Sequence, residues 1–230
     1  MLISHKYKFI FFKSVKTAST STFAFFTPYC LPENLKSEYD FKKRPLDKHL
    51  GIFKEGIIGR KNANQKIGEH PRHVKPKYVK EMLDKIDPNI WKTYFKFVNI
   101  RNPWDMTVSR YFFYKNYVWP NKKFDFQKFV QDLYESQYVI GNEKATSRDM
   151  YTLNKEYICD FHIRYENLKE DIKKVCENLE IKEFNVKTLQ NFNSEFREDR
   201  RNYQEMYNEK TKKLVEKMYI KDIEKFEYSF

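Results

Sequence analysis

Near the start of the chain, from Lys8 to Phe26, the sequence reads KFIFFKSVKTASTSTFAFF. Lys8–Phe12 is a short apolar run with charges on both sides, which is typical of a buried central strand. A hydroxyl-rich turn follows, and Thr17–Phe26 is predicted to be a helix that Pro28 and Pro32 end. A strand, a tight polar turn and a helix N-terminus often bind an anion. The turn lacks the glycine-rich phosphate-loop pattern G-x-x-x-x-G-K-[ST], so other features have to identify the anion.

Strands and helices alternate along the rest of the chain. YFKFVNI, Tyr94–Ile100, is a second clear strand, and the strand-like run Tyr157–Leu168 is expected to end near Arg164. Residues 33–69 have weak periodicity, which predicts loops and short helices. Helices are predicted at Pro76–Ile86, after Asn102-Pro103, at Phe124–Tyr134, at Glu170–Leu179 and at Glu209–Met218. This order predicts one α/β domain over residues 1–230, with three layers and a mostly parallel central sheet.

Composition limits the classes of function. The chain has 40% hydrophobic and 18% aromatic residues, too many for a disordered protein. Its formal charge of +12 indicates an anionic partner: nucleic acid, nucleotide, acidic glycan or membrane surface. A general lysine-rich surface would give the same total. The positions of the charges, and not their total, therefore have to distinguish an anion-binding site from a generally basic surface.

The three cysteines, Cys30, Cys159 and Cys176, are scattered without the spacing of metal ligands. An odd number without pairs indicates buried thiols in a reducing compartment. We find no signal peptide, because the FIFF run is short and lysines follow it, and no run near the roughly 18 apolar residues of a membrane span. The sequence thus predicts a cytoplasmic protein that binds no metal.

A second polar loop follows the second strand. In IRNPWDMTVSRY, Arg101 comes directly after the strand and Ser109 lies eight residues later in the next helix, which Asp105 can cap. An arginine offers a planar fork for a phosphate, and a serine can donate a further hydrogen bond. Because ligands of such sheets bind at the carboxyl ends of the strands, two polar loops there predict an anion site.

Four segments of the chain resemble one known family. FIFFKSVKTASTS resembles the 5′-phosphosulfate loop of sulfotransferases that use 3′-phosphoadenosine 5′-phosphosulfate (PAPS), and FKFVNIRNPWDMTVSRY resembles their 3′-phosphate motif. DFHIRYENLKED and the last 31 residues, Arg200–Phe230, are similar to segments of the carbohydrate-type branch. The resemblance implies a P-loop-like sulfotransferase fold. It does not cover roughly Glu33–Glu69 and Phe124–Asn154, which we expect to be insertions on the acceptor side.

The resemblance also implies roles for individual residues. Lys16 would contact the oxygen that bridges to the sulfate. Arg101 and Ser109 would bind the 3′-phosphate, and the product would be adenosine 3′,5′-bisphosphate (PAP). The 5′-phosphate would bind to side chains and backbone amides of Thr17, Ala18, Ser19, Thr20 and Ser21. The family commonly has proline, glycine and arginine where Val15, Ser19 and Met106 stand.

An acceptor hydroxyl needs a base to remove its proton. We expect His70 to be that base, since an imidazole titrates near neutral pH, with Glu69 and His73 as alternatives on the acceptor side. Arg72 there could meet an acidic acceptor. The acceptor is expected to be a carbohydrate or another hydroxylated compound.

Two other interpretations stay open at this point. A P-loop kinase or NTPase would need a glycine-rich loop and magnesium ligands. A basic nucleic-acid-binding module would show an RNP-like, helix-turn-helix or zinc pattern, and we see none.

Overall fold

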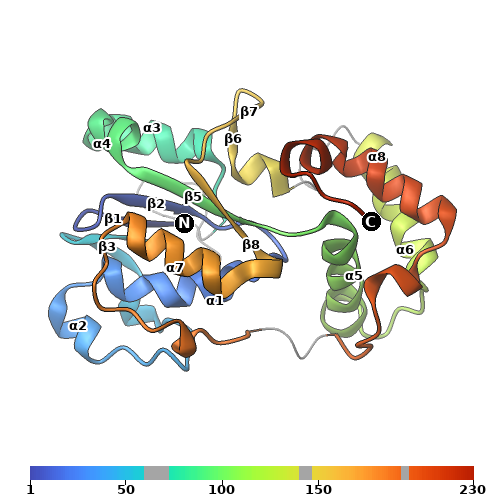
Figure 1. Cartoon of the computed structure of the whole chain (residues 1–230), viewed down its shortest axis with the longest axis horizontal. Helices are drawn as coiled ribbons and strands as arrows, with labels where there is room; N and C mark the ends of the chain where they lie inside the picture. Colours follow the sequence, from blue (N-terminus) through green and yellow to red (C-terminus); the bar gives the residue numbers. More distant parts are fainter. Residues whose placement is uncertain (60–72, 140–146, 193–196) are drawn as a thin grey trace. The chain divides into compact units, whose positions relative to one another are not determined.

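The computed structural model describes residues 1–59, 73–139, 147–192 and 197–230. The chain divides into two compact units (Figure 1). Unit 1 contains Met1–Ile100 and Asp149–Asn191, and unit 2 contains Arg101–Arg148 and Phe192–Phe230. That the whole chain is a single domain stays a prediction.

A six-stranded sheet with the order β3-β4-β1-β2-β5-β8 forms the centre of unit 1. The neighbours β2, β5 and β8 are parallel, whereas β3, β4, β1 and β2 pair antiparallel. The sheet is therefore mixed, and its parallel half carries the predicted loops. The strands are β1 Leu2–Ser4, β2 Phe9–Phe12, β3 Gly51–Phe53, β4 Gly56–Ile58, β5 Phe95–Ile100 and β8 Phe161–Arg164.

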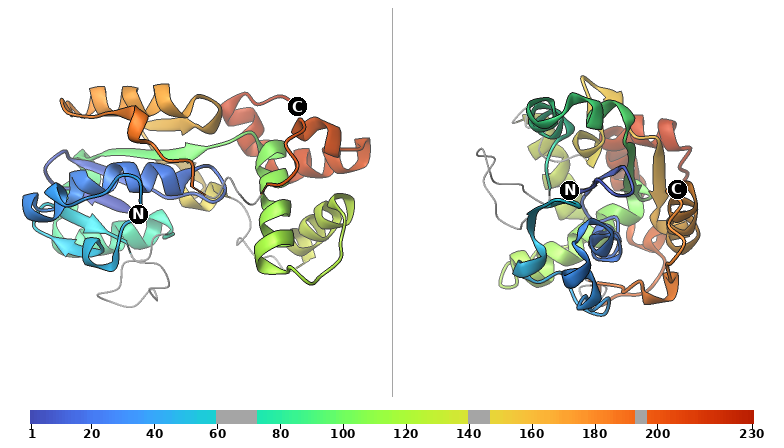
Figure 2. Two further views of the ribbon diagram at one scale, coloured as in Figure 1. Left: turned by 90° about the horizontal axis from the view of Figure 1, so that it is seen from below. Right: turned by 90° about the vertical axis from the view of Figure 1, so that its left-hand side faces the viewer.

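Helices cover both faces of this sheet. Side chains alternate along each strand, so each face presents apolar residues against which helices pack. Phe9, Phe11 and Phe97 point to one face, where they pack with α1 (Ser19–Phe26) and α7 (Leu168–Asn178). Phe12 points to the other face, and its ring lies 6.2 Å from that of Trp91 in α4 (Pro88–Thr93), next to α3 (Pro76–Ile86). Each buried phenyl ring contributes about 2 kcal/mol of hydrophobic stabilisation. The predicted three-layer α/β fold is confirmed (Figures 1 and 2).

The short strands of unit 1 were not predicted from the sequence. β1, β3 and β4 have three residues each, too few for a periodic pattern. At Gly56 in β4, an added Cβ would lie 2.2 Å from the Ile3 carbonyl oxygen, so only glycine allows this strand approach. Other elements of unit 1 are α2 (Glu33–Ser37) and a hairpin of β6 (Thr152–Leu153) and β7 (Glu156–Tyr157).

Unit 2 is helical. Its main helices are α5 (Pro103–Phe113), α6 (Phe126–Val139) and α8 (Glu209–Phe226), which pack against one another (Figure 2). A π-helical turn, η3 (Tyr114–Val118), follows α5. The apolar core of this unit includes Trp104, Val108, Tyr111, Val130, Val215 and Tyr219.

The cap of α5 differs from the sequence expectation. Asn102, not Asp105, is the N-cap, and its side chain accepts a hydrogen bond from the Trp104 backbone N–H at 3.0 Å. Pro103 occupies the first position of the helix, where a missing N–H costs nothing. Asp105 lies in the first turn and is therefore available to pair with a cation.

Cys30, Cys159 and Cys176 are all buried and unpaired, as predicted. Burial raises the pKa of each thiol, that of Cys176 to about 12, so these thiols stay protonated at neutral pH. In the part of the chain that the structure describes, no helix is both long and apolar enough to cross a bilayer.

Candidate functional site

The first anion loop, Lys13–Ala18, connects β2 to α1 and obtains its shape from left-handed backbone. Lys16 has φ 61° and Ala18 has φ 58°, whereas Thr17 between them does not have a positive φ. Such alternation turns successive backbone N–H groups toward one point, which suits an anion. A left-handed residue with a side chain costs about 1 kcal/mol, and strain of this kind concentrates at functional sites.

Hydroxyl groups hold this loop from within. Ser14 Oγ donates to the Asn99 carbonyl oxygen at 2.6 Å, so the 2.6 Å contact between Ser14 Oγ and Thr17 Oγ1 must use the proton of Thr17. Ser19 Oγ donates to the Ser14 carbonyl oxygen. Thr17 and Ser19 were predicted to bind phosphate, and the structure gives their side chains partners inside the loop.

The helix N-terminus after the loop lacks a side-chain cap. Ala18 is the N-cap residue of α1 and makes no capping hydrogen bond with its side chain. The predicted helix began at Thr17, but the left-handed Ala18 delays the start to Ser19. The first N–H groups of a helix need acceptors, and an anion can supply them. Lys16 is half-buried at this end, and Thr20 and Ser21 lie in the first turn of α1.

Lys13 is a buried cation that the sequence did not single out. Its side chain is at the carboxyl end of β2 and the residue is only 6% exposed. Lys13 Nζ lies 3.1 Å from Thr20 Oγ1 and 3.2 Å from His73 Nε2. His73 Nδ1 lies 2.9 Å from the Lys13 carbonyl oxygen. The loop therefore contains two lysines, one of them bonded to a histidine.

The predicted acceptor-side residues are only partly described. His70, Glu69 and Arg72 lie outside the described residues. His73 is described, and it contacts the loop through Lys13.

The second anion loop starts unit 2 and is built around a shared carboxylate. Arg101 Nε and Nη2 both lie 2.8 Å from Asp105 Oδ2, and Arg197 Nη1 lies 3.0 Å from Asp105 Oδ1. The side chains of Arg101 and Asp105 are 7% and 13% exposed. Two guanidinium groups thus share one carboxylate. Ser109 is half-buried one helical turn beyond Asp105, on the same face of α5.

The structure describes all three positions at which the chain departs from the family pattern. Met106 is buried in the apolar core of unit 2, so a core side chain replaces the common arginine. Val15 is 40% exposed at the position of the proline. Ser19 stands at the position of the glycine but begins α1, and the left-handed positions are Lys16 and Ala18 instead.

The carboxyl ends of β2 and β5 lie at the same edge of the sheet of unit 1. β2 and β5 are parallel neighbours, from Phe9 opposite Phe95 to Phe12 opposite Val98. The first loop begins directly after β2, and Arg101 directly follows β5. Carboxyl ends of adjacent parallel strands are the usual ligand position of such sheets.

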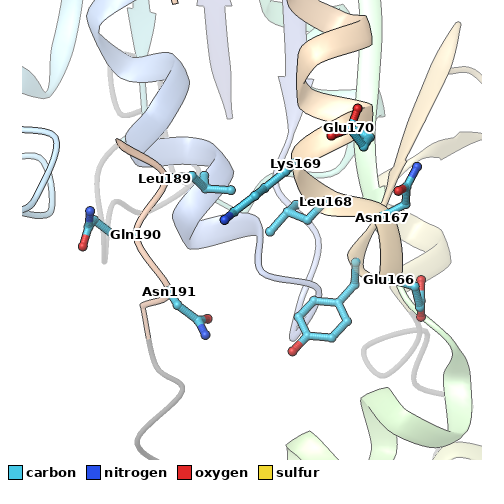
Figure 3. A pocket seen from close by; sticks show the side chains of 9 residues that line it. Glu166, Asn167, Leu168, Lys169, Glu170, Leu189, Gln190 and Asn191 are labelled. Carbon is cyan, nitrogen blue, oxygen red and sulfur yellow. The ribbon is translucent and has the colours of Figure 1, made fainter. Parts of the chain in front are cut away.

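A cavity of unit 1 lies beyond the third parallel strand, β8. Its volume is about 460 Å³. Figure 3 shows Leu168 and Lys169, at the start of α7, extending toward Leu189. Its lining consists of Tyr165, Glu166, Asn167, Leu168, Lys169, Glu170, Leu189, Gln190 and Asn191.

Comparisons with known proteins identify the fold and the family. Mouse sulfotransferase SULT7A1, in a crystal structure complexed with PAP, matches the fold with a TM-score of 0.54 and 13% identity, over 96% of this chain and 85% of the mouse chain. An uncharacterized protein of Archaeoglobus fulgidus is 33% identical over 103 residues, which are 44% of this chain and 79% of the relative.

A sequence model of the sulfotransferase family matches residues 1–229, nearly the full length. The match confirms the family and the enzyme class that the two loops predicted. This chain belongs to the sulfotransferase family.

Proposed function

We propose that this sulfotransferase transfers the sulfuryl group of PAPS to a hydroxyl or amine of a carbohydrate acceptor and releases PAP. The observation that carries the proposal is the pair of loops at the carboxyl ends of β2 and β5. The first combines backbone N–H groups, an uncapped helix start and Lys16, and the second presents Arg101 beside Asp105. PAPS likewise carries anionic groups at its 5′ and 3′ positions.

In this proposal the first loop binds the 5′-phosphosulfate. The backbone amides of residues 17–21 bind the 5′-phosphate. The hydroxyls of Thr17 and Ser19, which were predicted to bind it as well, form hydrogen bonds inside the loop instead. Thr20 accepts from Lys13 and keeps its own proton to donate. Lys16 stabilises the negative charge that grows on the bridging oxygen as the bond to sulfur breaks.

The second loop binds the 3′-phosphate through Arg101 and Ser109. The cavity beyond β8 is large enough for a nucleoside and lies beyond the third strand of the parallel set. The acceptor oxygen attacks sulfur, a base takes its proton, and PAP leaves with the electron pair of the broken S–O bond. This scheme needs no metal ion. We also propose a cytoplasmic location, which the three unpaired thiols support.

The proposed base lies in the segment 69–73. His70 and Glu69 stay candidates from the sequence, and His73 is favoured by its contact with the loop. The two single variants His70→Asn and His73→Asn distinguish between the two histidines. The variant of the true base should lose about 100-fold or more in kcat while its affinity for PAP is kept.

The proposed function is tested by comparing PAPS with adenosine 5′-phosphosulfate, the donor without the 3′-phosphate. The wild type should bind PAPS much more tightly in calorimetry. Arg101→Ala should remove about 10- to 100-fold of this preference, because a charge-assisted contact contributes about 1.5–3 kcal/mol. Arg44→Ala, at an exposed arginine of unit 1, is the matched control.

Equal binding of the two donors by the wild type would contradict the donor assignment. The acceptor class is tested by transfer of radiolabelled sulfate from PAPS to a panel of glycans, polyphenols and peptides. Labelling confined to the polyphenols or peptides would exclude a carbohydrate acceptor.

A further inference from the structure

Lys13 is an uncommon residue for its position. Lysine is rarely buried unless a partner compensates its charge, and this one is 6% exposed. Its ammonium group contacts a hydroxyl, Thr20 Oγ1, and an imidazole, His73 Nε2. These contacts place the ammonium group at the start of α1, beside the proposed 5′-phosphate site.

The two contacts of His73 determine which ring nitrogen carries the proton. An ammonium group can only donate, so Nε2, 3.2 Å from Lys13 Nζ, must accept and has no proton. A carbonyl oxygen can only accept, so Nδ1, 2.9 Å from Lys13 O, must donate and carries the proton. One residue thus makes both contacts, with its backbone and with its side chain.

We propose that Lys13 is a positioning residue that holds the His73 ring in the Nδ1–H tautomer, with Nε2 unprotonated, and connects it to Thr20 of the donor loop. An unprotonated ring nitrogen is what a general base requires. The role in sulfuryl transfer rests on the proposed function, whereas the tautomer and the contact do not.

The contact between Lys13 Nζ and His73 Nε2 also couples the proposed base to donor binding. When Nε2 takes the acceptor proton, the ring becomes a cation, and an ammonium group 3.2 Å away opposes it. The anionic sulfuryl oxygens of a bound donor compete for the ammonium group and draw it from Nε2. The hydrogen bond from Nδ1 to the Lys13 carbonyl oxygen keeps the ring in place during this exchange. His73 should therefore be open to the acceptor only after the donor has bound.

The tautomer is tested by long-range ¹H–¹⁵N NMR of the histidine rings in the full chain without ligand. The chain has five histidines, and His73→Asn assigns the signal. We expect a protonated Nδ1 and an unprotonated Nε2 at neutral pH in the wild type. Lys13→Met should shift the ring toward the Nε2–H tautomer, which is favoured in water, whereas Lys13→Arg keeps a cationic donor and should preserve the signal. Lys92→Met, at an exposed lysine of α4, should change nothing.

An Nε2–H ring in the wild type, or an unchanged ring in a folded Lys13→Met protein, would overturn the proposal. If Lys13→Met does not fold, loss of the Nδ1–H signal in Lys13→Arg would overturn it as well. In the transfer assay, Lys13→Met should lower kcat about 10- to 100-fold with little change in the KM of the acceptor, and Lys13→Arg should restore part of it. Absence of sulfotransfer together with the expected NMR result would refute the function and leave the pair intact.

Discussion

The two loops that we propose to bind anions are built by different means. The first, after β2, obtains its shape from backbone, with Lys16 and Ala18 left-handed and the hydroxyls of Ser14 and Ser19 bonded within the loop. The second obtains its shape from charge, with Asp105 bonded to two arginines. Its backbone is an ordinary helix start with a capping asparagine and a proline.

This difference tells which substitutions each loop tolerates. A loop shaped by backbone presents N–H groups that every residue has, so its side chains can vary if the turn is kept. A loop shaped by ion pairs depends on the side chains themselves, and removal of one partner leaves a charge without compensation. Stability and donor binding should therefore respond differently in the two loops.

Asp105→Asn should have the largest effect. It removes the carboxylate that Arg101 and Arg197 share, and two partly buried guanidinium groups then lose this negative partner. We expect the free energy of unfolding to fall by about 2–4 kcal/mol in urea denaturation. The preference for PAPS over adenosine 5′-phosphosulfate should also fall, because Arg101 loses its support.

The matched control is Asp132→Asn in α6, whose exposed carboxylate pairs with Lys128, and it should leave unfolding and donor preference unchanged. If Asp105→Asn behaved like this control, the second loop would not depend on its ion pairs.

Ser14→Ala should have a smaller effect, confined to the first loop. It leaves the Asn99 carbonyl oxygen and the Thr17 hydroxyl without their bonds in a buried position. We expect a loss of about 1–3 kcal/mol in unfolding free energy. Ser37→Ala, which removes an exposed hydroxyl bonded to a backbone oxygen, should cost less than about 0.5 kcal/mol. Equal losses in the two variants would mean that the hydroxyls do not hold the loop.

Ala18→Gly should have the smallest effect and the opposite sign. Glycine adopts a left-handed φ without the cost of a Cβ, so relief of strain should exceed the added freedom of the unfolded chain by about 0.5 kcal/mol. The same substitution at Ala24, inside the right-handed α1, should destabilise the protein by about 1 kcal/mol. Thermal unfolding of the two variants shows whether each substitution raises or lowers the stability. Destabilisation by Ala18→Gly would show that the backbone is not strained at Ala18.

Long periodic elements could be predicted from the sequence, and short ones could not. The helix Pro76–Ile86 was predicted with the bounds of α3, and the strands β2 and β5 within one residue. β1 pairs with β4 across about 50 residues of chain, and β3 pairs with β4 in a short hairpin. Strands of three residues are too short to show a periodic pattern. The sequence also placed the α5 cap on Asp105, because aspartate is a common cap, although Asn102 before the proline fulfils that role.

Site residues could be predicted only where they belong to a recognisable sequence motif. Lys16, Arg101 and Ser109 came from order and spacing along the chain, and their roles stay proposals. Lys13 was missed because a lysine after a strand is usually exposed, and its burial depends on a histidine 60 residues away. A lysine flanked by an apolar strand and a hydroxyl-rich turn was the signal that could have indicated it.

The glycine-free first loop has a consequence for the thermodynamics of donor binding. Lys16 and Ala18 have far fewer accessible conformations than glycines would have, so the free loop is already close to one geometry. Less chain entropy is then lost when a phosphosulfate binds, so a smaller unfavourable entropy opposes the favourable binding enthalpy. The chain thus meets the cost of ordering this loop during folding, and the donor does not have to meet it again at each turnover.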